Sequence, residues 1–408
     1  MKKPELLCPA GSPEVLRIAV RYGADAVYIG GEAFSLRAKA RNFSLEDMAA
    51  SIDFAHSKGV RVYVTANILA RDEDLPQAAE YFRELAAMKP SPPDALIISD
   101  PGIYDLAVEI CPDIERHIST QANNTNYGTY LFWHRLGAKR VVSARELSME
   151  ELSQIRSHIP EDMEIETFIH GSMCISYSGR CLLSKFLTGR DANRGECTHP
   201  CRWKYALMEE TSEGEYFPIY ENDRGSFILN SRDLCMVDHI PELVEAGIDS
   251  FKIEGRMKNA LYVATMADTY RRAIDDYFAD PELYLGSLER YRAMIRGCTY
   301  RKYTTGFFFP EKQEDTQIYD GSTYERGRTY LGYVEKAEGP VIYITQKNKF
   351  LKGDEIEVMK PGEDPLKVKV LAIENDEGEE MESAPHAGQH LKVTLDRSGA
   401  EELDVLCV

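Results

Sequence analysis

The chain of 408 residues has no run of about 18 consecutive apolar residues, so the sequence predicts no membrane-spanning helix. The amino-terminal segment carries two lysines, but Pro9, Gly11 and Pro13 interrupt its apolar residues. We therefore expect no signal peptide and a cytoplasmic protein. Net positive charge is also lacking. The formal net charge of −19 argues against a protein that coats nucleic acid through its overall charge.

Several catalytic signatures are absent as well. There is no HExxH zinc-peptidase helix, no GxSxG nucleophile elbow and no radical-SAM cysteine triplet, and the first predicted loop carries no GxGxxG fingerprint. These absences argue against the common metallopeptidases, serine hydrolases and dinucleotide-binding enzymes.

Apolar runs typical of strands alternate with amphipathic helical segments over the first 280 residues. Eight such runs occur, at 5–11, 24–31, 60–67, 95–100, 116–122, 139–145, 164–171 and 249–256. An open doubly wound sheet also fits this alternation, but eight strands over this length favour a closed (β/α)8 barrel of the TIM type in residues 1–280.

The remaining residues predict two further parts. Residues 281–330 indicate a helical and irregular connection. From residue 331 to 408 the apolar residues alternate with a period of two, and glycines and acidic turns separate the runs. This pattern predicts a small C-terminal antiparallel β-barrel domain, with a sandwich as the alternative.

Charged and amide side chains follow the predicted strands where a barrel of this type places its active site. The opposite strand ends hold mainly Gly, Ala and Asp turns. A ring of cations on one face of an acidic protein predicts a phosphate-rich or carboxylate-rich substrate. Glu166 and Lys252, on neighbouring strands, can form either a structural ion pair or an acid–base couple. The residues at these ends are Arg37, Asn67, Gln121, Arg145, Glu166, His170, Lys252, Glu254 and Arg256.

Four of the nine cysteines lie between Cys174 and Cys201, in an insertion at 174–205 that we call the cysteine loop. Four thiolates can bind zinc or an iron–sulfur cluster. The six residues between the first two cysteines do not fit a zinc knuckle, and Cys235 is an alternative fourth ligand. The loop also holds six basic residues against two acidic ones; the basic residues are Arg180, Lys185, Arg190, Arg194, Arg202 and Lys204.

Four segments carry a resemblance to a known family. They are ETFIHGSMCISYSGRCLLS, ELLCPAGSPEVLRIAVRYGADAVYIGG, GRDANRGECTHPCRWKY and GIDSFKIEGRMKN. In order and spacing, the first resembles the signature of the collagenase-like peptidase family U-32, and the other three strengthen the resemblance. It is closest to the family's branch of tRNA 5-hydroxyuridine hydroxylation proteins. The resemblance spans the predicted barrel, and the C-terminal domain is similar to one found in many members.

The resemblance implies an RNA-modifying enzyme that converts the wobble uridine of tRNA to 5-hydroxyuridine without oxygen, with prephenate as a co-substrate. It also implies an iron–sulfur cluster, of the 4Fe-4S type, on Cys174, Cys181, Cys197 and Cys201. We expect a small dicarboxylate to bind Arg145, Lys252 and Arg256. The predicted catalytic residues are Glu166, His170, Lys252 and Glu254, and the residues expected to grip RNA are Arg180, Arg190, Arg194, Arg202 and Lys204.

Other interpretations stay open at this point. The chain can be a U-32 peptidase, in which Cys174 and His170 are the nearest approach to a thiol–imidazole pair. It can also hydroxylate another RNA or a quinone precursor together with a partner protein, or work as a homo-oligomer. Zinc is the alternative metal. The sequence does not decide between Cys201 and Cys235 as the fourth ligand, nor does it give the role of the C-terminal domain.

Overall fold

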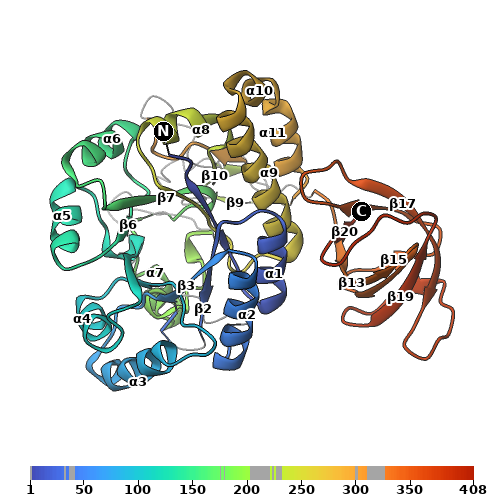
Figure 1. Ribbon diagram of the computed structural model, residues 1–408, viewed down its shortest axis with the longest axis horizontal. Helices are drawn as coiled ribbons and strands as arrows, with labels where there is room; N and C mark the ends of the chain where they lie inside the picture. Colours follow the sequence, from blue (N-terminus) through green and yellow to red (C-terminus); the bar gives the residue numbers. More distant parts are fainter. Residues whose placement is uncertain are drawn as a thin grey trace, which may run out of the picture.

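The computed structural model describes residues 2–31, 34–35, 42–174, 176–178, 180–202, 221–222, 225–226, 232–298, 302–309 and 327–408. These residues form two closed barrels that follow each other along the chain (Figure 1). Within these ranges, no helix has the length and apolar character needed to cross a membrane.

The first barrel is built from eight parallel strands, which confirms the predicted TIM-like fold. It closes through the pairing of the seventh of these strands with the eighth, where Glu166 lies opposite Ser250 and Phe168 opposite Lys252. The strands are β1 (Glu5–Pro9), β2 (Ala26–Gly30), β3 (Arg61–Ala66), β4 (Ala95–Ile98), β5 (Glu115–Ile118), β6 (Arg140–Val142), β7 (Glu164–Ser172) and β11 (Ser250–Ile253).

Helices connect these strands and cover the outside of the barrel (Figure 1). Their starts follow ordinary capping chemistry: the Ser12 and Ser44 side chains accept hydrogen bonds from the backbone N–H groups of Val15 and Asp47. The helices are α1 (Pro13–Arg21), α2 (Leu45–Ser57), α3 (Leu75–Ala86), α4 (Pro101–Ile110), α5 (Tyr127–Arg135), α6 (Met149–His158), α8 (Ile240–Glu245) and α9 (Ala260–Ala279).

The interior of the first barrel is apolar on one side and charged on the other. A separate apolar cluster fills the part lined by β1 to β4, and its members include Leu7, Tyr28, Tyr63 and Ile97. The charged part comes largely from β6, β7 and β11 and is described below. Barrels of this type usually fill their interior with branched aliphatic layers. Packing alone therefore does not explain why charged side chains occupy the other half of the interior.

β7 is longer than the other strands of the barrel and leaves it at its carboxyl end. Its last residues pair with the antiparallel strand β10 (Asp233–Cys235), which pairs in turn with β12 (Tyr303–Thr304). A register irregularity between Lys252 and Ile253 marks the point where β7 turns away. The cysteine loop starts directly after this departure and contains α7 (Leu183–Thr188) and the short helices η3 (Ala192–Arg194) and η4 (Pro200–Arg202).

Two helices, α10 (Pro281–Gly286) and α11 (Leu288–Arg296), follow the first barrel. The predicted antiparallel β domain is a closed barrel of six strands in the order β13-β14-β19-β17-β16-β20. These strands are β13 (Tyr330–Glu338), β14 (Val341–Thr345), β16 (Glu355–Met359), β17 (Leu366–Glu374), β19 (His390–Leu395) and β20 (Val405–Cys407). The short strands β15 (Phe350–Leu351) and β18 (Ser383–Ala384) form a separate pair.

The second barrel packs against α1 and α9 of the first, as Figure 1 shows. The Tyr22 hydroxyl donates to the carbonyl oxygen of Met359 at 2.6 Å and accepts from the N–H of Val405 at 3.1 Å. Arg21 forms an ion pair with Asp404, which is fully buried, at 2.6 Å. Buried polar contacts of this kind fix the two barrels in one arrangement.

Candidate functional site

Cationic side chains gather around the ring of Phe168 near the carboxyl ends of β6, β7 and β11. The Arg145 guanidinium lies 3.9 Å from the ring centroid and Lys252 Nζ lies 5.5 Å from it. Arg145 Nη1 donates to the backbone oxygen of Ser172 at 2.7 Å. Its buried Nε has no hydrogen-bond partner among the described residues. A buried cationic donor without an acceptor is suited to binding an anion.

Arg256 extends this cationic group toward β2 and β3. Its side chain is 6% exposed, and its Nη1 donates to the Ser35 hydroxyl at 2.6 Å and to the Thr65 hydroxyl at 2.8 Å. Gly30 makes room for the guanidinium, because a Cβ atom at that position would lie 2.1 Å from Nη1 of Arg256. Three of the predicted substrate-binding cations, Arg145, Lys252 and Arg256, therefore occupy the same region of the barrel.

Lys252 and Glu166 form the ion pair that the sequence predicted. Lys252 Nζ donates to Glu166 Oε1 at 2.6 Å, and both side chains are almost fully buried. Burial lowers the pKa of Lys252, the Glu166 carboxylate raises it, and the neighbouring Arg140 and Arg256 lower it further, so that the net shift is downward. A lysine with a lowered pKa can exchange a proton nearer to neutral pH than an exposed lysine can.

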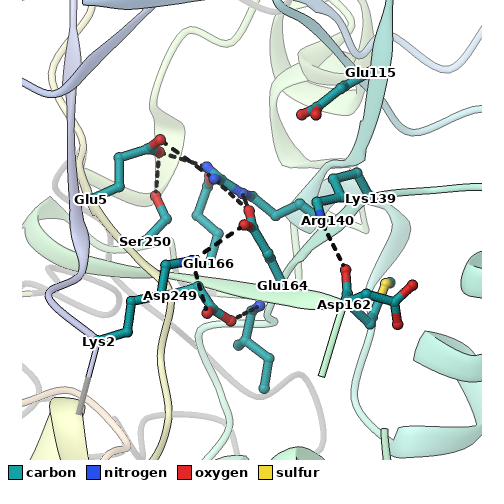
Figure 2. Close-up of polar contacts among 12 residues, drawn as sticks. Lys2, Glu5, Glu115, Lys139, Arg140, Asp162, Glu164, Glu166, Asp249 and Ser250 are labelled. Carbon is teal, nitrogen blue, oxygen red and sulfur yellow. Dashed lines mark hydrogen bonds and ion pairs between the residues drawn. The ribbon is translucent and has the colours of Figure 1, made fainter. Parts of the chain in front are cut away.

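The buried ion pair continues to the amino-terminal end of the barrel, where the sequence had indicated mainly Gly, Ala and Asp turns. Figure 2 shows Arg140 bonded to three carboxylates, from Glu5, Glu164 and Glu166, at 2.6, 2.6 and 3.2 Å. Arg140 is 1% exposed. Although burial raises the pKa of Glu5, the charges of Arg140 and Arg61 lower it to about 2. Sequence reasoning missed this network because its members meet only when the barrel closes.

A hollow of about 460 Å³ opens beside this network, at the amino-terminal mouth of the barrel. Lys2, Lys58, Arg61 and Asp249 are among the residues that line it. Figure 2 shows Lys2 close to Asp249 and Glu164, with which it forms long ion pairs of 3.9 and 3.7 Å. Residues at this end of a TIM-like barrel usually serve stability. We therefore place the candidate site at the opposite mouth, which the cysteine loop crosses.

The cysteine loop contacts the loops that follow β3 and β5. Arg194 forms a bidentate ion pair with Asp74, with distances of 2.8 and 3.0 Å. Asn193 accepts a hydrogen bond from the Gln121 amide at 3.2 Å, and its backbone oxygen accepts from Leu69 N–H at 3.4 Å. Because β3 lies across the barrel from β7, and β5 lies two strands from it, these contacts carry the loop over the carboxyl-terminal mouth. Arg194 and Gln121 thus position the loop.

Asn67 also lies at this mouth. Its side-chain nitrogen donates to the Ser119 hydroxyl at 3.4 Å, while its buried Oδ1 has no partner within the described part of the chain. An amide oxygen in this state is free to accept a hydrogen bond from a substrate.

His170 and Glu254 are not brought together with Glu166 and Lys252. His170 follows the irregularity in β7 and packs toward α9, where its Nδ1 lies 3.2 Å from the Tyr270 hydroxyl. Burial lowers its pKa to about 3, and Lys258 contributes to the shift. The backbone N–H of Glu254 donates to the carbonyl oxygen of His170 at 2.9 Å. A catalytic role for His170 and Glu254 stays a prediction, and the geometry gives it no support.

The four cysteines of the cysteine loop all reach the protein surface. Cys174 is exposed, and Cys181, Cys197 and Cys201 are partly exposed, as is Cys235 on β10; the remaining four cysteines are buried. Four accessible thiols on one short loop fit a soft metal or an iron–sulfur cluster in their donor chemistry. Among the described residues, however, no group of three or more His, Cys, Asp or Glu side chains is arranged to hold a metal ion.

Cys235 lies on β10, outside the cysteine loop. It is opposite His170 in the sheet, and its sulfur lies 3.8 Å from the Tyr270 hydroxyl. Burial raises its pKa to about 11, which opposes the thiolate form that a metal needs. This placement favours Cys201 over Cys235 as the fourth ligand.

The basic residues of the cysteine loop divide into two groups. Arg194 is bound to Asp74, and Lys185 forms an ion pair with Asp191 at 3.3 Å. Arg180, which is exposed, and Arg190, which is partly exposed, form no ion pair with any described residue. Arg37 and Lys204 lie outside the described residues, and the side chain of Arg202 is likewise not described.

The fold and the site together define a TIM-like barrel whose cationic carboxyl-terminal mouth lies under a cysteine-bearing loop. The sequence profile of peptidase family U32 matches residues 11–318, and the profile of the family's C-terminal domain matches residues 326–406. The chain belongs to peptidase family U32.

Several relatives are similar over most of the chain. The tRNA hydroxylation protein P1 of Bacillus subtilis is 39% identical over 400 residues, which cover 97% of this chain and 93% of that protein. The tRNA hydroxylation protein P of Escherichia coli is 37% identical over 95% of this chain and 93% of that protein. The 23S rRNA 5-hydroxycytidine C2501 synthase of Escherichia coli is 35% identical over 78% of this chain and 47% of that protein.

Among solved structures, the U32 peptidase Mk0906 matches 62% of this chain and 93% of its own, with a TM-score of 0.41 and 17% identity. The names of the sequence relatives support the prediction of an RNA-hydroxylating enzyme of this family.

Proposed function

We propose that this chain is a tRNA-modifying enzyme that hydroxylates the wobble uridine to 5-hydroxyuridine without oxygen, with prephenate as co-substrate. The observation that carries the proposal is similarity over nearly the whole chain to proteins named for tRNA hydroxylation. The cationic mouth of the barrel and the cysteine loop above it supply a site for two anionic reactants, an RNA and a small dicarboxylate.

The dicarboxylate binds Arg145, Lys252 and Arg256 in this proposal. Arg145 has no carboxylate partner within the described chain, and its Nε lacks an acceptor, so an incoming carboxylate satisfies a donor that is otherwise buried and unpaired. The Phe168 ring packs against both Arg145 and Lys252 and forms an apolar wall for the body of the ligand.

Lys252 and Glu166 are the proposed acid–base couple. Arg140 contacts the second oxygen of Glu166 at 3.2 Å, while the first accepts from Lys252 Nζ at 2.6 Å. Both carboxylate oxygens are thus held, and the lysine is left to move a proton at Nζ. Arg140 is a positioning residue in this arrangement, since it acts through Glu166.

Cys174, Cys181, Cys197 and Cys201 are proposed to hold an iron–sulfur cluster, of the 4Fe-4S type. Such a cluster supplies one-electron transfer or activation of a bound substrate. The support is the exposure of the four thiols and their position on a loop that crosses the barrel mouth. Brown protein that contains iron and sulfide after anaerobic purification is the expected result, whereas colourless protein with one zinc would contradict this part.

Arg180 and Arg190 are the proposed phosphate contacts of the cysteine loop, because neither forms an ion pair within the described part of the protein. Arg194 contributes by holding the loop to Asp74. Arg202 and Lys204 remain predicted contacts on sequence grounds.

The test is nucleoside mass spectrometry of total tRNA from a strain that lacks the gene. We expect 5-hydroxyuridine and its derivatives to disappear and to return when the wild-type gene is supplied. An unchanged nucleoside profile, together with gelatin cleavage by the purified protein, would overturn the proposal in favour of a peptidase. Gelatin cleavage that survives substitution of Cys174 and Cys181 would point to an active site elsewhere.

A further inference from the structure

The short helix α7 presents its polar side to the protein and its apolar side to solvent. Ser184 is fully buried, and its hydroxyl lies 3.1 Å from that of Thr198 and accepts from Thr198 N–H. One turn further along, Thr188 Oγ1 lies 3.4 Å from the same Thr198 hydroxyl. This is the reverse of the usual surface helix, whose apolar side faces the core.

Large apolar side chains occupy the outer side of α7. Phe186 is 85% exposed and Leu182, four residues earlier, is 64% exposed. Residues spaced by four lie next to each other on a helix, so the two side chains form one surface. Together with Ser176, Cys181 and Leu183 they line a shallow hollow of about 590 Å³, a size usual for small-ligand sites.

One cation lines this apolar hollow, and two more are close to it in the sequence. Lys185 lines the same hollow, Arg180 directly precedes Cys181, and Arg190 lies two residues after the end of α7. Because Arg180 and Arg190 form no ion pair with described residues, their charges are available to a ligand. An exposed aromatic ring beside unpaired cations complements the two surfaces of an unpaired nucleotide, the flat base and the phosphate.

We propose that Phe186 and Leu182 form a stacking surface for an unpaired base of the RNA substrate, with Lys185, Arg180 and Arg190 binding the flanking phosphates. This inference rests on the proposed function, and it adds the residue that receives a base. Cys181 lines the same hollow, so a base stacked on Phe186 lies beside one of the predicted cluster ligands.

The test compares binding of a fluorescein-labelled tRNA anticodon stem-loop with binding of a fully paired RNA duplex, by fluorescence anisotropy on the anaerobically purified full-length protein. Phe186→Ala removes one base–aromatic stack, so it should weaken stem-loop binding about tenfold. We expect duplex binding to be unchanged and Phe186→Trp to restore stem-loop affinity. The matched control is Phe132→Ala, since Phe132 is 46% exposed on α5, outside the cysteine loop.

Salt dependence separates stacking from phosphate contact. Lys185→Gln should reduce the slope of log affinity against log salt by about 1, whereas Phe186→Ala should leave the slope unchanged. With Phe186 so exposed, its removal should not alter the thermal unfolding curve.

Two results would overturn the stacking surface. The first is equal stem-loop affinity for Phe186→Ala and wild type. The second is a sedimentation coefficient of Phe186→Ala that differs from that of the wild type, which would mean that Phe186 packs against a second chain. A wild-type protein that binds no stem-loop at all would instead contradict the proposed function, so the two failures can be told apart.

Discussion

Arg140 offsets the free-energy cost of burying carboxylates inside the first barrel. Its guanidinium reaches Glu5, Glu164 and Glu166 at the same time, and through Glu166 it connects to Lys252. Buried charges are costly unless each has a partner, so removal of the cation that these three carboxylates share leaves the network with an excess of negative charge. The network therefore couples the stability of the barrel to the arrangement of the proposed acid–base couple.

We expect Arg140→Met to lower the free energy of unfolding by about 3 to 5 kcal/mol, the range for breaking a buried ion pair. Arg61→Met is the matched control. Arg61 also pairs with Glu5, but its side chain is 44% exposed, so the expected loss is about 1 kcal/mol or less. Urea denaturation at pH 7 measures both. Equal losses for the two variants would show that burial of Arg140 has no special role.

His170 should make the protein less stable in weak acid. In the folded protein its pKa is lowered from 6.5 to about 3, so it stays neutral between these values while the unfolded chain takes up a proton. Stability from this group is complete above pH 6.5 and is lost as the pH falls. Between pH 7 and 5 the wild type should lose about 2 kcal/mol more than His170→Asn. Parallel pH profiles from urea denaturation would contradict the assignment.

From the sequence, contacts could be predicted between residues on strands that are adjacent in the barrel. Glu166 and Lys252 were predicted as neighbours because β7 and the last strand must meet for the barrel to close. Glu5 and Arg140 come from strands that are not adjacent, and only the geometry of the closed interior brings them together. The position of His170 depends on an irregularity in β7, which the alternation of apolar residues does not reveal.

At the scale of elements, the departure of β7 from the barrel sets up the site. Its carboxyl end pairs with β10, and the cysteine loop between them returns across the mouth to Asp74 and Gln121. The eight barrel strands and their helices were predictable because the strands alternate regularly with amphipathic helical segments along the chain. β10 and β12, of three and two residues, lie outside this alternation and are too short to be recognised alone.

Metal analysis of matched variants can identify the cysteine that serves as the fourth ligand of the proposed cluster. We expect Cys201→Ser to lose most of the iron and sulfide of the anaerobically purified protein. Cys235→Ser should retain them, because the Cys235 sulfur is held near Tyr270 and its pKa is raised to about 11. Loss of iron in Cys235→Ser with retention in Cys201→Ser would reverse the assignment.

At the scale of the whole molecule, the second barrel is attached through buried polar contacts rather than by a loose linker. The Tyr22 hydroxyl serves as acceptor for Val405 N–H and as donor to the Met359 carbonyl. Tyr330, Met359 and Val405 of the second barrel belong to the same apolar cluster as the core of the first barrel. The sequence predicted a separate C-terminal domain, but the docking face was not predictable because its contacts join residues far apart in the chain, such as Tyr22 and Val405.

Tyr22→Phe should lower the free energy of unfolding by about 1 to 3 kcal/mol, since it leaves the buried N–H of Val405 without an acceptor. Tyr343→Phe is the control. The Tyr343 hydroxyl lies 3.4 Å from Glu338 at the surface of the second barrel, and its removal should change stability by about 0.5 kcal/mol or less. Chemical denaturation followed by tyrosine fluorescence measures both. A Tyr22→Phe variant as stable as Tyr343→Phe would show that this contact does not secure the interface.

The central claim is that the protein hydroxylates tRNA at the carboxyl-terminal mouth of its first barrel, with the buried cations and the cysteine loop as the site. The most direct test is nucleoside mass spectrometry of tRNA from the deletion strain that carries single variants at equal protein levels. Lys252→Met and Cys181→Ser should each leave 5-hydroxyuridine absent. Lys139→Met should restore it, since Lys139 is a partly exposed lysine whose Nζ donates to the backbone oxygen of Asp162 (Figure 2). Normal 5-hydroxyuridine in the Lys252→Met and Cys181→Ser strains would contradict the account.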